Sequence, residues 1–290
     1  MKQIAILGPG LLGGSIALAL RERGGAHVRV WGRRAAAVEE VRAAGCADVA
    51  STEIASVVGG ADVVILATPV GVLPELAREV VRHASPSALV TDVGSVKAPV
   101  AAALTPIFEG RARFIGSHPM AGSERTGLAA ARADLFSGAV CLVTPTKETP
   151  AETIDDATAL WEGLGGVVHV LSPVAHDAAV AWISHLPHLL AATLVNTVVA
   201  RDPAALALCG PGFRDTTRVA AGPPPMWTEI LAENHGAVRV ALEALIEKLN
   251  ALATLLDRPP GERDPLMHDF LTQAKAARDR LRIPAARHHV

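Results

Sequence analysis

A glycine-rich turn close to the start of the chain restricts its fold more than any other feature of the 290 residues. It follows an apolar run at residues 3–7 and matches the pattern G-x-G-x-x-G, with the residues Gly8, Gly10, Leu11, Leu12 and Gly13. In a strand–turn–helix unit, Gly8 allows a tight turn, Gly10 lets a pyrophosphate approach the backbone, and Gly13 lets the helix pack on the strand. The first N–H groups of such a helix bind the anion. The sequence therefore predicts a dinucleotide-binding unit in which these five residues contact the cofactor.

The apolar segments predict a doubly wound, Rossmann-type α/β domain over residues 1–171. Short aliphatic runs alternate with helical segments, and the expected strands span residues 3–7, 27–31, 62–67, 88–92, 113–116, 139–144 and 167–171. These runs are continuously apolar, which indicates a parallel sheet covered by helices on both faces.

No strand pattern follows residue 171, so we expect an all-α domain over residues 172–290. Its helices are predicted at residues 173–200, 227–256 and 262–282. The most apolar stretch, residues 189–200, is shorter than the about 20 residues of a membrane span, so we interpret it as a buried helix and expect no membrane association. Because large obligate interfaces resemble a domain core, these apolar helices also predict a homodimer.

Composition and charge exclude several other classes of protein. Lysine and arginine total 27 against 29 aspartate and glutamate, and this net charge of −2 gives no general attraction to nucleic acid. The three cysteines are scattered, and no leader segment is recognisable before the first apolar run, so we expect a cytoplasmic protein. The chain has no tyrosine, which excludes reductase chemistry that uses a tyrosine and lysine pair.

The residues after the second expected strand favour NADP over NAD. An NAD site usually has an acidic residue there, which hydrogen-bonds the ribose 2′-hydroxyl. This chain instead has Gly32, Arg33 and Arg34, which leave space and offer two guanidinium groups to a 2′-phosphate. NAD stays open as an alternative, because both arginines would also suit a solvent-facing position. We assign Thr68 and Pro69, after the strand expected at residues 62–67, to the same cofactor site.

Four further motifs carry polar residues that suit catalysis or binding. They span residues 92–97, 117–124, 184–188 and 212–218, and Trp227 follows the last of them. The first two follow expected strands, so they lie at the carboxyl edge of the sheet, where open α/β folds bind ligands. With the glycine motif and in this order, they resemble the prephenate dehydrogenase family, which includes arogenate and cyclohexadienyl dehydrogenases. The resemblance runs from Gly8 to about residue 256 and implies oxidative decarboxylation of a cyclohexadienol to a phenol, in tyrosine biosynthesis.

The resemblance implies a role for each polar residue. His118 would take the proton of the ring hydroxyl, Ser95 would hydrogen-bond the hydroxyl region and the nicotinamide, and Arg218 would bind the ring carboxylate. Loss of CO2 removes the charge that Arg218 binds, so we expect this arginine to act in binding and orientation rather than in the chemical step. The other residues assigned to the substrate site are His188, His185, Ser184, Asp215, Glu124 and Trp227.

Some of these residues have simpler interpretations. His185 and His188 are three positions apart and could share a metal ion, but no third ligand has suitable spacing, so no metal is expected. Asp215 would orient the arginine three residues later or cap a turn. Lys97 and Glu124 would line the cleft or form a surface ion pair.

Two other functions stay open at this point. A β-hydroxyacid dehydrogenase also joins such a nucleotide domain to helices, although the helical half lacks the Gly-rich, Lys-containing catalytic helix of those enzymes. The second alternative is an NADP(H)-binding sensor without catalysis, which the joint presence of Ser95, His118 and Arg218 disfavours. No residue decides between prephenate and arogenate, which differ by a keto or an amino group on the side chain.

Overall fold

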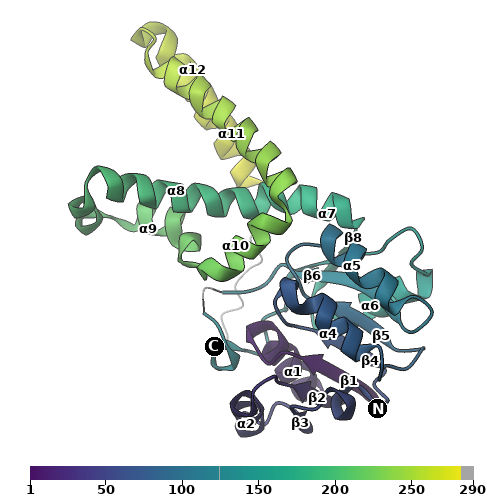
Figure 1. Cartoon of the computed structure of the whole chain (residues 1–290). Helices are drawn as coiled ribbons and strands as arrows, with labels where there is room; N and C mark the ends of the chain where they lie inside the picture. The colour runs from purple at the N-terminus through teal and green to yellow at the C-terminus, as the bar shows by residue number, and fades with distance from the viewer. Residues whose placement is uncertain (124, 282–290) are drawn as a thin grey trace. The chain divides into compact units, whose positions relative to one another are not determined.

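The computed structural model describes residues 1–123 and 125–281 of the chain (Figure 1). The chain forms two compact units, Met1–Val238 and Arg239–Val290. The first unit contains the whole sheet and the helices up to the start of α11, and the second contains the rest of α11 and helix α12. The domain boundary expected at residue 171 does not coincide with this division and stays a prediction.

An eight-stranded sheet forms the centre of the first unit, in the order β3-β2-β1-β4-β5-β6-β7-β8. The strands are β1 (Lys2–Leu7), β2 (Ala26–Trp31), β3 (Val49–Ser51), β4 (Val63–Leu66), β5 (Leu89–Asp92), β6 (Arg113–Pro119), β7 (Val140–Thr144) and β8 (Val167–Val170). The doubly wound fold class is confirmed, and each expected strand is present. Sequence reasoning missed β3, because a strand of 3 residues is too short to show a period.

The apolar strands are buried on both faces because alternate residues enter two separate cores. In β1, Ile4 and Ile6 belong to one core, and Ala5 and Leu7 belong to the other. The helices that contribute to the first core are α1 (Leu11–Arg23), α2 (Ala35–Ala43) and α6 (Ala151–Gly163). Those of the second are α3 (Ile54–Val58), α4 (Leu73–Val80), α5 (Ala98–Phe108) and, through Ile230, α10 (Pro224–Glu233). This two-sided burial is the physical cause of the continuous apolar runs in the sequence.

The sheet departs from the predicted parallel arrangement at one end. Strands β6 and β7 are antiparallel, with His118 opposite Leu142, whereas β7 and β8 pair in parallel. In the described part of the connection from β6 to β7, the helical element is the short η2 (Leu128–Ala130). The expectation of an all-parallel sheet was wrong here because burial on both faces makes a strand apolar whichever way it runs.

Helices follow β8, as the sequence predicts. They are α7 (Pro173–Val180), η3 (Ala181–His185), α8 (Leu186–Arg201), η4 (Pro203–Leu208), α9 (Pro211–Thr217), η5 (Arg218–Ala221), α10 (Pro224–Glu233), α11 (His235–Leu256) and α12 (Pro260–Asp279). The helix predicted over residues 227–256 is divided at Asn234, where α10 ends. A π-helical turn, η3, separates α7 from α8, and such turns occur frequently at functional sites.

The apolar stretch at residues 189–200 is not the buried helix that the sequence predicts. Leu190 and Val199, on α8, are 43% and 38% exposed in the single chain. By length and composition alone the continuous run Pro173–Arg201 could cross a membrane, which for one helix is a weak indication. The prediction was wrong because an apolar pattern reports a need for burial and does not identify the surface that provides it.

The last two glycines of the glycine-rich motif, Gly10 and Gly13, give a test of its packing. A Cβ on Gly13 would lie 2.0 Å from the Gly8 carbonyl oxygen, whereas a Cβ on Gly10 would meet nothing within 4 Å. We expect Gly13→Ala to lower the free energy of unfolding by about 1–3 kcal/mol through overpacking. Gly10→Ala is the matched control and should leave it nearly unchanged. Urea denaturation measures both variants, and equal stability would contradict the close packing.

Candidate active site

The glycine loop has the geometry that a dinucleotide requires. Gly8 has a φ of +114°, in the left-handed region that favours glycine, and its Cβ would lie 2.5 Å from the Ala67 carbonyl oxygen. Helix α1 begins after Gly10, and no side chain caps its first N–H groups, which remain available to an anion. The Cβ position of Gly8 is 3.0 Å from Cγ2 of Thr68, so the segment with Thr68 and Pro69 adjoins the loop.

The end of β2 presents positive charge next to this loop. Gly32 is buried, and a Cβ on this residue would lie 3.6 Å from the Cγ of Pro9. Arg33 and Arg34 are exposed and directly precede α2. Neither guanidinium makes a hydrogen bond or an ion pair with another residue that the structure describes. Glu39, one of the nearest acidic residues in sequence, pairs with an arginine of its own helix. Two guanidinium groups are therefore available at the end of β2, beside the glycine loop.

A buried ion pair holds the ends of β5 and β6 together. Lys97 and Asp92 are both fully buried and form an ion pair, and the Lys97 Nζ also donates to the Ser117 carbonyl oxygen at 2.9 Å. The second Asp92 oxygen accepts from the Ser117 N–H at 3.3 Å. The surface ion pair that was one interpretation of Lys97 is therefore wrong, because the partner is a strand-end carboxylate inside the protein. The pair fixes the backbone that carries His118.

Three side chains form a hydrogen-bonded chain that ends at His118. The His118 Nδ1 lies 2.9 Å from the His176 Nε2, and the His176 Nδ1 lies 2.7 Å from the Asp177 Oδ1. An ionised carboxylate can only accept, so His176 carries its hydrogen on Nδ1 and, when neutral, has a lone pair on Nε2. His118 must then donate from its own Nδ1. This arrangement leaves a lone pair on the His118 Nε2.

The surroundings of His118 keep its ring neutral. Burial lowers the pKa of His118 well below its ordinary value of 6.5, and positive charge on His176, Lys97 or His185 lowers it further. A neutral imidazole with an unprotonated Nε2 can take a proton from a hydroxyl group. A side chain that can act as a general base therefore lies at the carboxyl edge of the sheet.

The Asp177 carboxylate also caps helix α5. Its Oδ1 accepts from the Lys97 N–H at 2.7 Å, and its Oδ2 accepts from the Ala98 N–H at 2.8 Å. Negative charge at the N-terminus of a helix is stabilised by the free N–H groups and the helix dipole. The Asp177 side chain on α7 thus orients the histidine chain and caps the N-terminus of α5.

Imidazole and indole rings gather beside this chain. His188 stacks on Trp227, with 3.6 Å between ring centroids and 10° between the planes, and His185 lies edge-on to the same indole at 6.2 Å. Burial lowers the pKa of both histidines, that of His185 to about 4. The His185 Nε2 and the His188 Nδ1 are buried without a hydrogen-bond partner in the described part of the chain. Each such atom costs about 1–3 kcal/mol unless a ligand satisfies it.

The remaining predicted residues lie around these rings or on nearby helices. Ser95 is half-buried in the loop after β5, and Ser184 is half-buried in η3. Arg218 begins η5 and Asp215 lies on α9, and both are exposed. Glu124 lies outside the described residues. Within the described ranges there is no group of three or more His, Cys, Asp or Glu that could hold a metal ion.

Sequence reasoning missed His176, Asp177 and Asn234. His176 and Asp177 look like ordinary polar residues near the start of a predicted helix, and His118 is 58 positions away. Asn234 lies inside a segment that was predicted to be one helix. The signal that could have found the first two is an adjacent His-Asp pair in an otherwise very apolar helix, since buried charge requires a partner.

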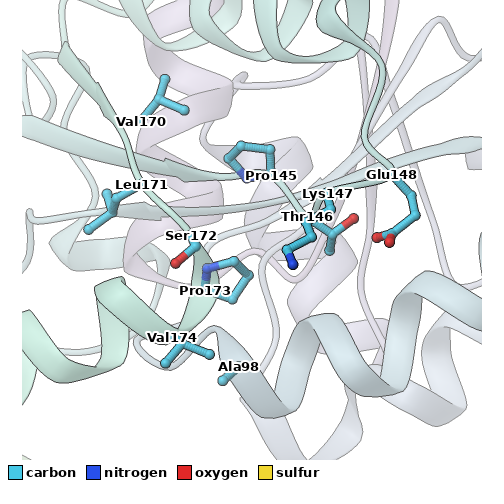
Figure 2. A pocket seen from close by; sticks show the side chains of 10 residues that line it. All are labelled: Ala98, Pro145, Thr146, Lys147, Glu148, Val170, Leu171, Ser172, Pro173 and Val174. Carbon is cyan, nitrogen blue, oxygen red and sulfur yellow. The ribbon is translucent and has the colours of Figure 1, made fainter.

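A surface groove of about 490 Å³ lies apart from these residues. Figure 2 shows its walls, which come from the loop after β7, with Thr146 and Lys147, and from the end of β8 and the start of α7, with Val170 and Val174. No residue assigned above to the cofactor or the substrate lines it. The groove is therefore not part of the candidate active site.

The fold and the site together define a class of enzyme. The glycine loop follows β1, and His118 lies near the end of β6. Because the strands β1, β4, β5 and β6 pair in parallel, the loop and His118 lie at the same edge of the sheet. A dinucleotide loop beside a neutral base suits removal of a hydride from an alcohol carbon and of a proton from its oxygen. This is the site of a nicotinamide-dependent oxidoreductase.

Comparison with known proteins identifies the family. Residues 16–170 match the model of the prephenate dehydrogenase nucleotide-binding domain, and residues 172–272 match that of the prephenate dehydrogenase dimerization domain. The chain belongs to the prephenate dehydrogenase family, oxidoreductases that carry out the NAD(P)-dependent oxidative decarboxylation of prephenate or arogenate in tyrosine biosynthesis. The β-hydroxyacid dehydrogenase alternative is therefore wrong, and the resemblance seen in the sequence is confirmed.

Individual relatives are similar over nearly the whole chain. The prephenate dehydrogenase of Bacillus subtilis (strain 168) is 33% identical over 287 residues, which cover 96% of this chain and 76% of the relative. The crystal structure of prephenate dehydrogenase from A. aeolicus, in complex with hydroxyphenyl propionate and NAD+, has a TM-score of 0.87 at 33% identity and covers 96% of this chain and 97% of that one. Synechocystis arogenate dehydrogenase has a TM-score of 0.81 at 33% identity, with 96% and 99% covered.

The lowered pKa of His185 predicts a loss of stability in mild acid. Its folded pKa is about 4 against an ordinary value of 6.5, so between these values the unfolded chain binds a proton that the folded chain does not. From pH 7.5 to pH 5, this difference lowers the free energy of unfolding by about 2 kcal/mol. Urea denaturation at both pH values should show that His185→Gln removes this part of the pH dependence.

The matched control is His268→Gln, because the His268 side chain is 78% exposed. This variant should keep the full pH dependence of the free energy of unfolding. A pH dependence that is the same in His185→Gln and in the unsubstituted chain would contradict the lowered pKa.

Proposed function

We propose that the chain oxidises and decarboxylates a cyclohexadienol with a ring carboxylate, prephenate or arogenate, and that NADP is its preferred cofactor. The observation that carries the proposal is the hydrogen-bonded chain from Asp177 through His176 to His118, because it leaves a base on the His118 Nε2. Relatives that act on prephenate and on arogenate, by their names, are each 33% identical to this chain and therefore support both substrates equally.

The reaction transfers a hydride and a proton to two different acceptors and releases CO2. A bound nicotinamide would supply the acceptor for the hydride of the hydroxyl-bearing carbon. His118 takes the proton of that hydroxyl at its Nε2. The bond between the ring and its carboxylate then breaks, CO2 leaves, and the electron pair of the bond makes the ring aromatic. The phenolate oxygen that results takes up a proton and becomes the phenol.

His176 and Asp177 act through His118 and not on the substrate. They hold the His118 ring in the tautomer whose Nε2 can accept a proton. When His118 becomes positively charged, its Nδ1–H still donates to His176, and the negative charge of Asp177 stabilises the charged pair. Because both are buried, water does not screen this interaction.

Ser95 and Arg218 hold the substrate in this scheme. Ser95 follows β5 in the loop next to His118, where its hydroxyl hydrogen-bonds the hydroxyl of the substrate and the nicotinamide. The Arg218 guanidinium binds the ring carboxylate with two parallel hydrogen bonds. This ion pair weakens as CO2 forms, so Arg218 contributes to binding more than to the rate of the chemical step.

The charge at the end of β2 supports NADP. Arg33 and Arg34 are exposed without partners among the described residues. A 2′-phosphate provides two negative charges for these groups, whereas a ribose hydroxyl provides none. The A. aeolicus relative was crystallised with NAD+, so the preference of this chain rests on its own two arginines.

We also propose a homodimer that forms through the helical part of the chain. In the single chain several large apolar residues of this part are exposed, among them Trp182 at 47%, Ile183 at 66% and Leu208 at 85%. Exposed apolar surface of this kind is typical of an obligate interface, and the family model matched by residues 172–272 describes a dimerization domain. Sedimentation velocity tests this assembly.

The three free cysteines favour a reducing compartment, and we propose the cytoplasm.

A comparison of kcat/KM for prephenate and arogenate, each with NAD and with NADP, tests the proposed activity. We expect turnover of at least one substrate, with a higher kcat/KM for NADP. If the chain binds NADP tightly but turns over neither substrate, it is a nucleotide-binding protein without this activity, and the proposal is wrong.

The histidine chain predicts different effects for its two histidines. His118→Gln should lower kcat by about 10²–10⁴-fold, because the general base is lost. His176→Asn should lower kcat by less and should move the acid limb of the pH profile of kcat to lower pH, since the acceptor that stabilises the positively charged His118 ring is removed. The control is His169→Asn, at an exposed position on β8. An unchanged acid limb in His176→Asn would contradict the support assigned to His176.

The cofactor preference predicts a selective loss. Arg33→Ala combined with Arg34→Ala should raise the KM for NADP by about 10- to 100-fold, because hydrogen bonds to a charged group are removed. The KM for NAD should change little. Arg78→Ala, at an exposed position on α4, is the control for loss of surface charge. Equal losses with NADP and NAD would show that the arginines do not recognise the 2′-phosphate.

A further inference from the structure

One ring nitrogen in the substrate site has an unusual position. His185 is fully buried, its Nδ1 lies 3.1 Å from the Asn234 Nδ2, and its Nε2 has no hydrogen-bond partner in the described part of the chain. The ring lies edge-on to Trp227, beside His188. A positive charge on His185 lowers the pKa of His118, so the two rings lie near each other. The unpartnered nitrogen is therefore in the same cluster as the base.

Asn234 fixes which His185 nitrogen carries the hydrogen. The Asn234 Nδ2 lies 2.8 Å from the Asp177 backbone carbonyl oxygen, which can only accept, so this atom is the amide NH2 group and not the amide oxygen. The second hydrogen of that NH2 group faces the His185 Nδ1. The His185 Nδ1 must then be a lone pair. In a neutral ring the hydrogen is consequently on Nε2.

The substrate site thus contains a buried N–H donor that is fixed in place and has no acceptor among the described residues. Prephenate and arogenate share their hydroxyl and both carboxylates, and they differ where prephenate has a keto oxygen and arogenate has an ammonium group. A keto oxygen accepts a hydrogen bond from an N–H donor. An ammonium group can only donate, so it leaves such a donor unpaired and places two donors against each other.

We propose that Asn234 is a specificity-determining residue, which holds His185 as an Nε2–H donor and so makes the site select the keto acid prephenate over the amino acid arogenate. Asn234 is a positioning residue in this scheme, because it acts through His185 and does not contact the substrate. The proposal rests on the proposed function and adds the choice between its two substrates.

Asn234→Asp tests the proposal directly. A carboxylate at this position would accept from the His185 Nδ1, which moves the ring hydrogen to Nδ1 and leaves a lone pair on Nε2. The ratio of kcat/KM for prephenate to kcat/KM for arogenate should fall by about 10- to 100-fold, since a site loses this much selectivity when a buried donor is replaced by an acceptor. Asn250→Asp makes the same chemical change at an exposed position of α11 and should leave the ratio unchanged.

A second pair of variants keeps the test independent of the folding of Asn234→Asp. His185→Gln can place an amide N–H near the former Nε2, whereas His185→Asn reaches only to the former Nδ1. His185→Gln should keep the preference for prephenate within about threefold, and His185→Asn should lose about tenfold or more of it. Nitrogen-15 NMR of the histidine rings, with His185 assigned from the variants, should show the Nε2–H tautomer in the unsubstituted enzyme.

The outcomes separate this inference from the proposed function. Turnover of neither substrate by the unsubstituted enzyme would overturn the proposed function. Turnover with a substrate ratio that Asn234→Asp and His185→Asn do not change would overturn the role of Asn234 and leave the proposed function intact. An Nδ1–H tautomer of His185 would also overturn it.

Discussion

The carboxylate of Asp177 is the interaction on which the rest of the site depends. It accepts hydrogen bonds from the N–H groups of Lys97 and Ala98, which begin helix α5, and it lies 2.7 Å from the His176 ring. The backbone carbonyl of the same residue accepts from Asn234. One residue of α7 therefore joins the helix after β5, the histidine chain to His118 and the end of α10. A buried carboxylate that makes this many hydrogen bonds holds its partners in one arrangement.

Burial gives the site its chemistry as well as its geometry. Desolvation lowers the pKa of His118, His185 and His188, so these rings are neutral at pH 7 and can act as bases, donors or acceptors. The cost is a set of polar atoms that need partners. Asp92 and Lys97 satisfy each other and the Ser117 backbone, whereas one nitrogen each of His185 and His188 is left for a ligand. In this site, the atoms without partners are those that the substrate would complete.

The positions of most strands and of the helical part could be predicted from the sequence, whereas the direction of β7 and the exposure of α8 could not. The apolar runs located every strand except β3, and the loss of strand pattern after residue 171 located the helical part. The reversal of β7 and the exposure of α8 were missed, because an apolar pattern reports burial without reporting strand direction or the partner that covers a surface. Within the site, the glycine loop and His118 lie in local motifs. His176 and Asp177 do not, since they matter through hydrogen bonds to residues far away in the sequence.

The sequence by itself determined the kinds of groups that are present: a glycine turn for a dinucleotide, two arginines after β2, a histidine in the motif that follows the strand expected at residues 113–116, and no strand pattern after residue 171. Local spacing is enough for these, because turns and helix starts depend on neighbouring residues. Only the tertiary structure decided the protonation of each ring. Which nitrogen of His118 or His185 carries a hydrogen depends on the acceptor or donor opposite it, and Asp177 and Asn234 reach those positions only when the chain has folded.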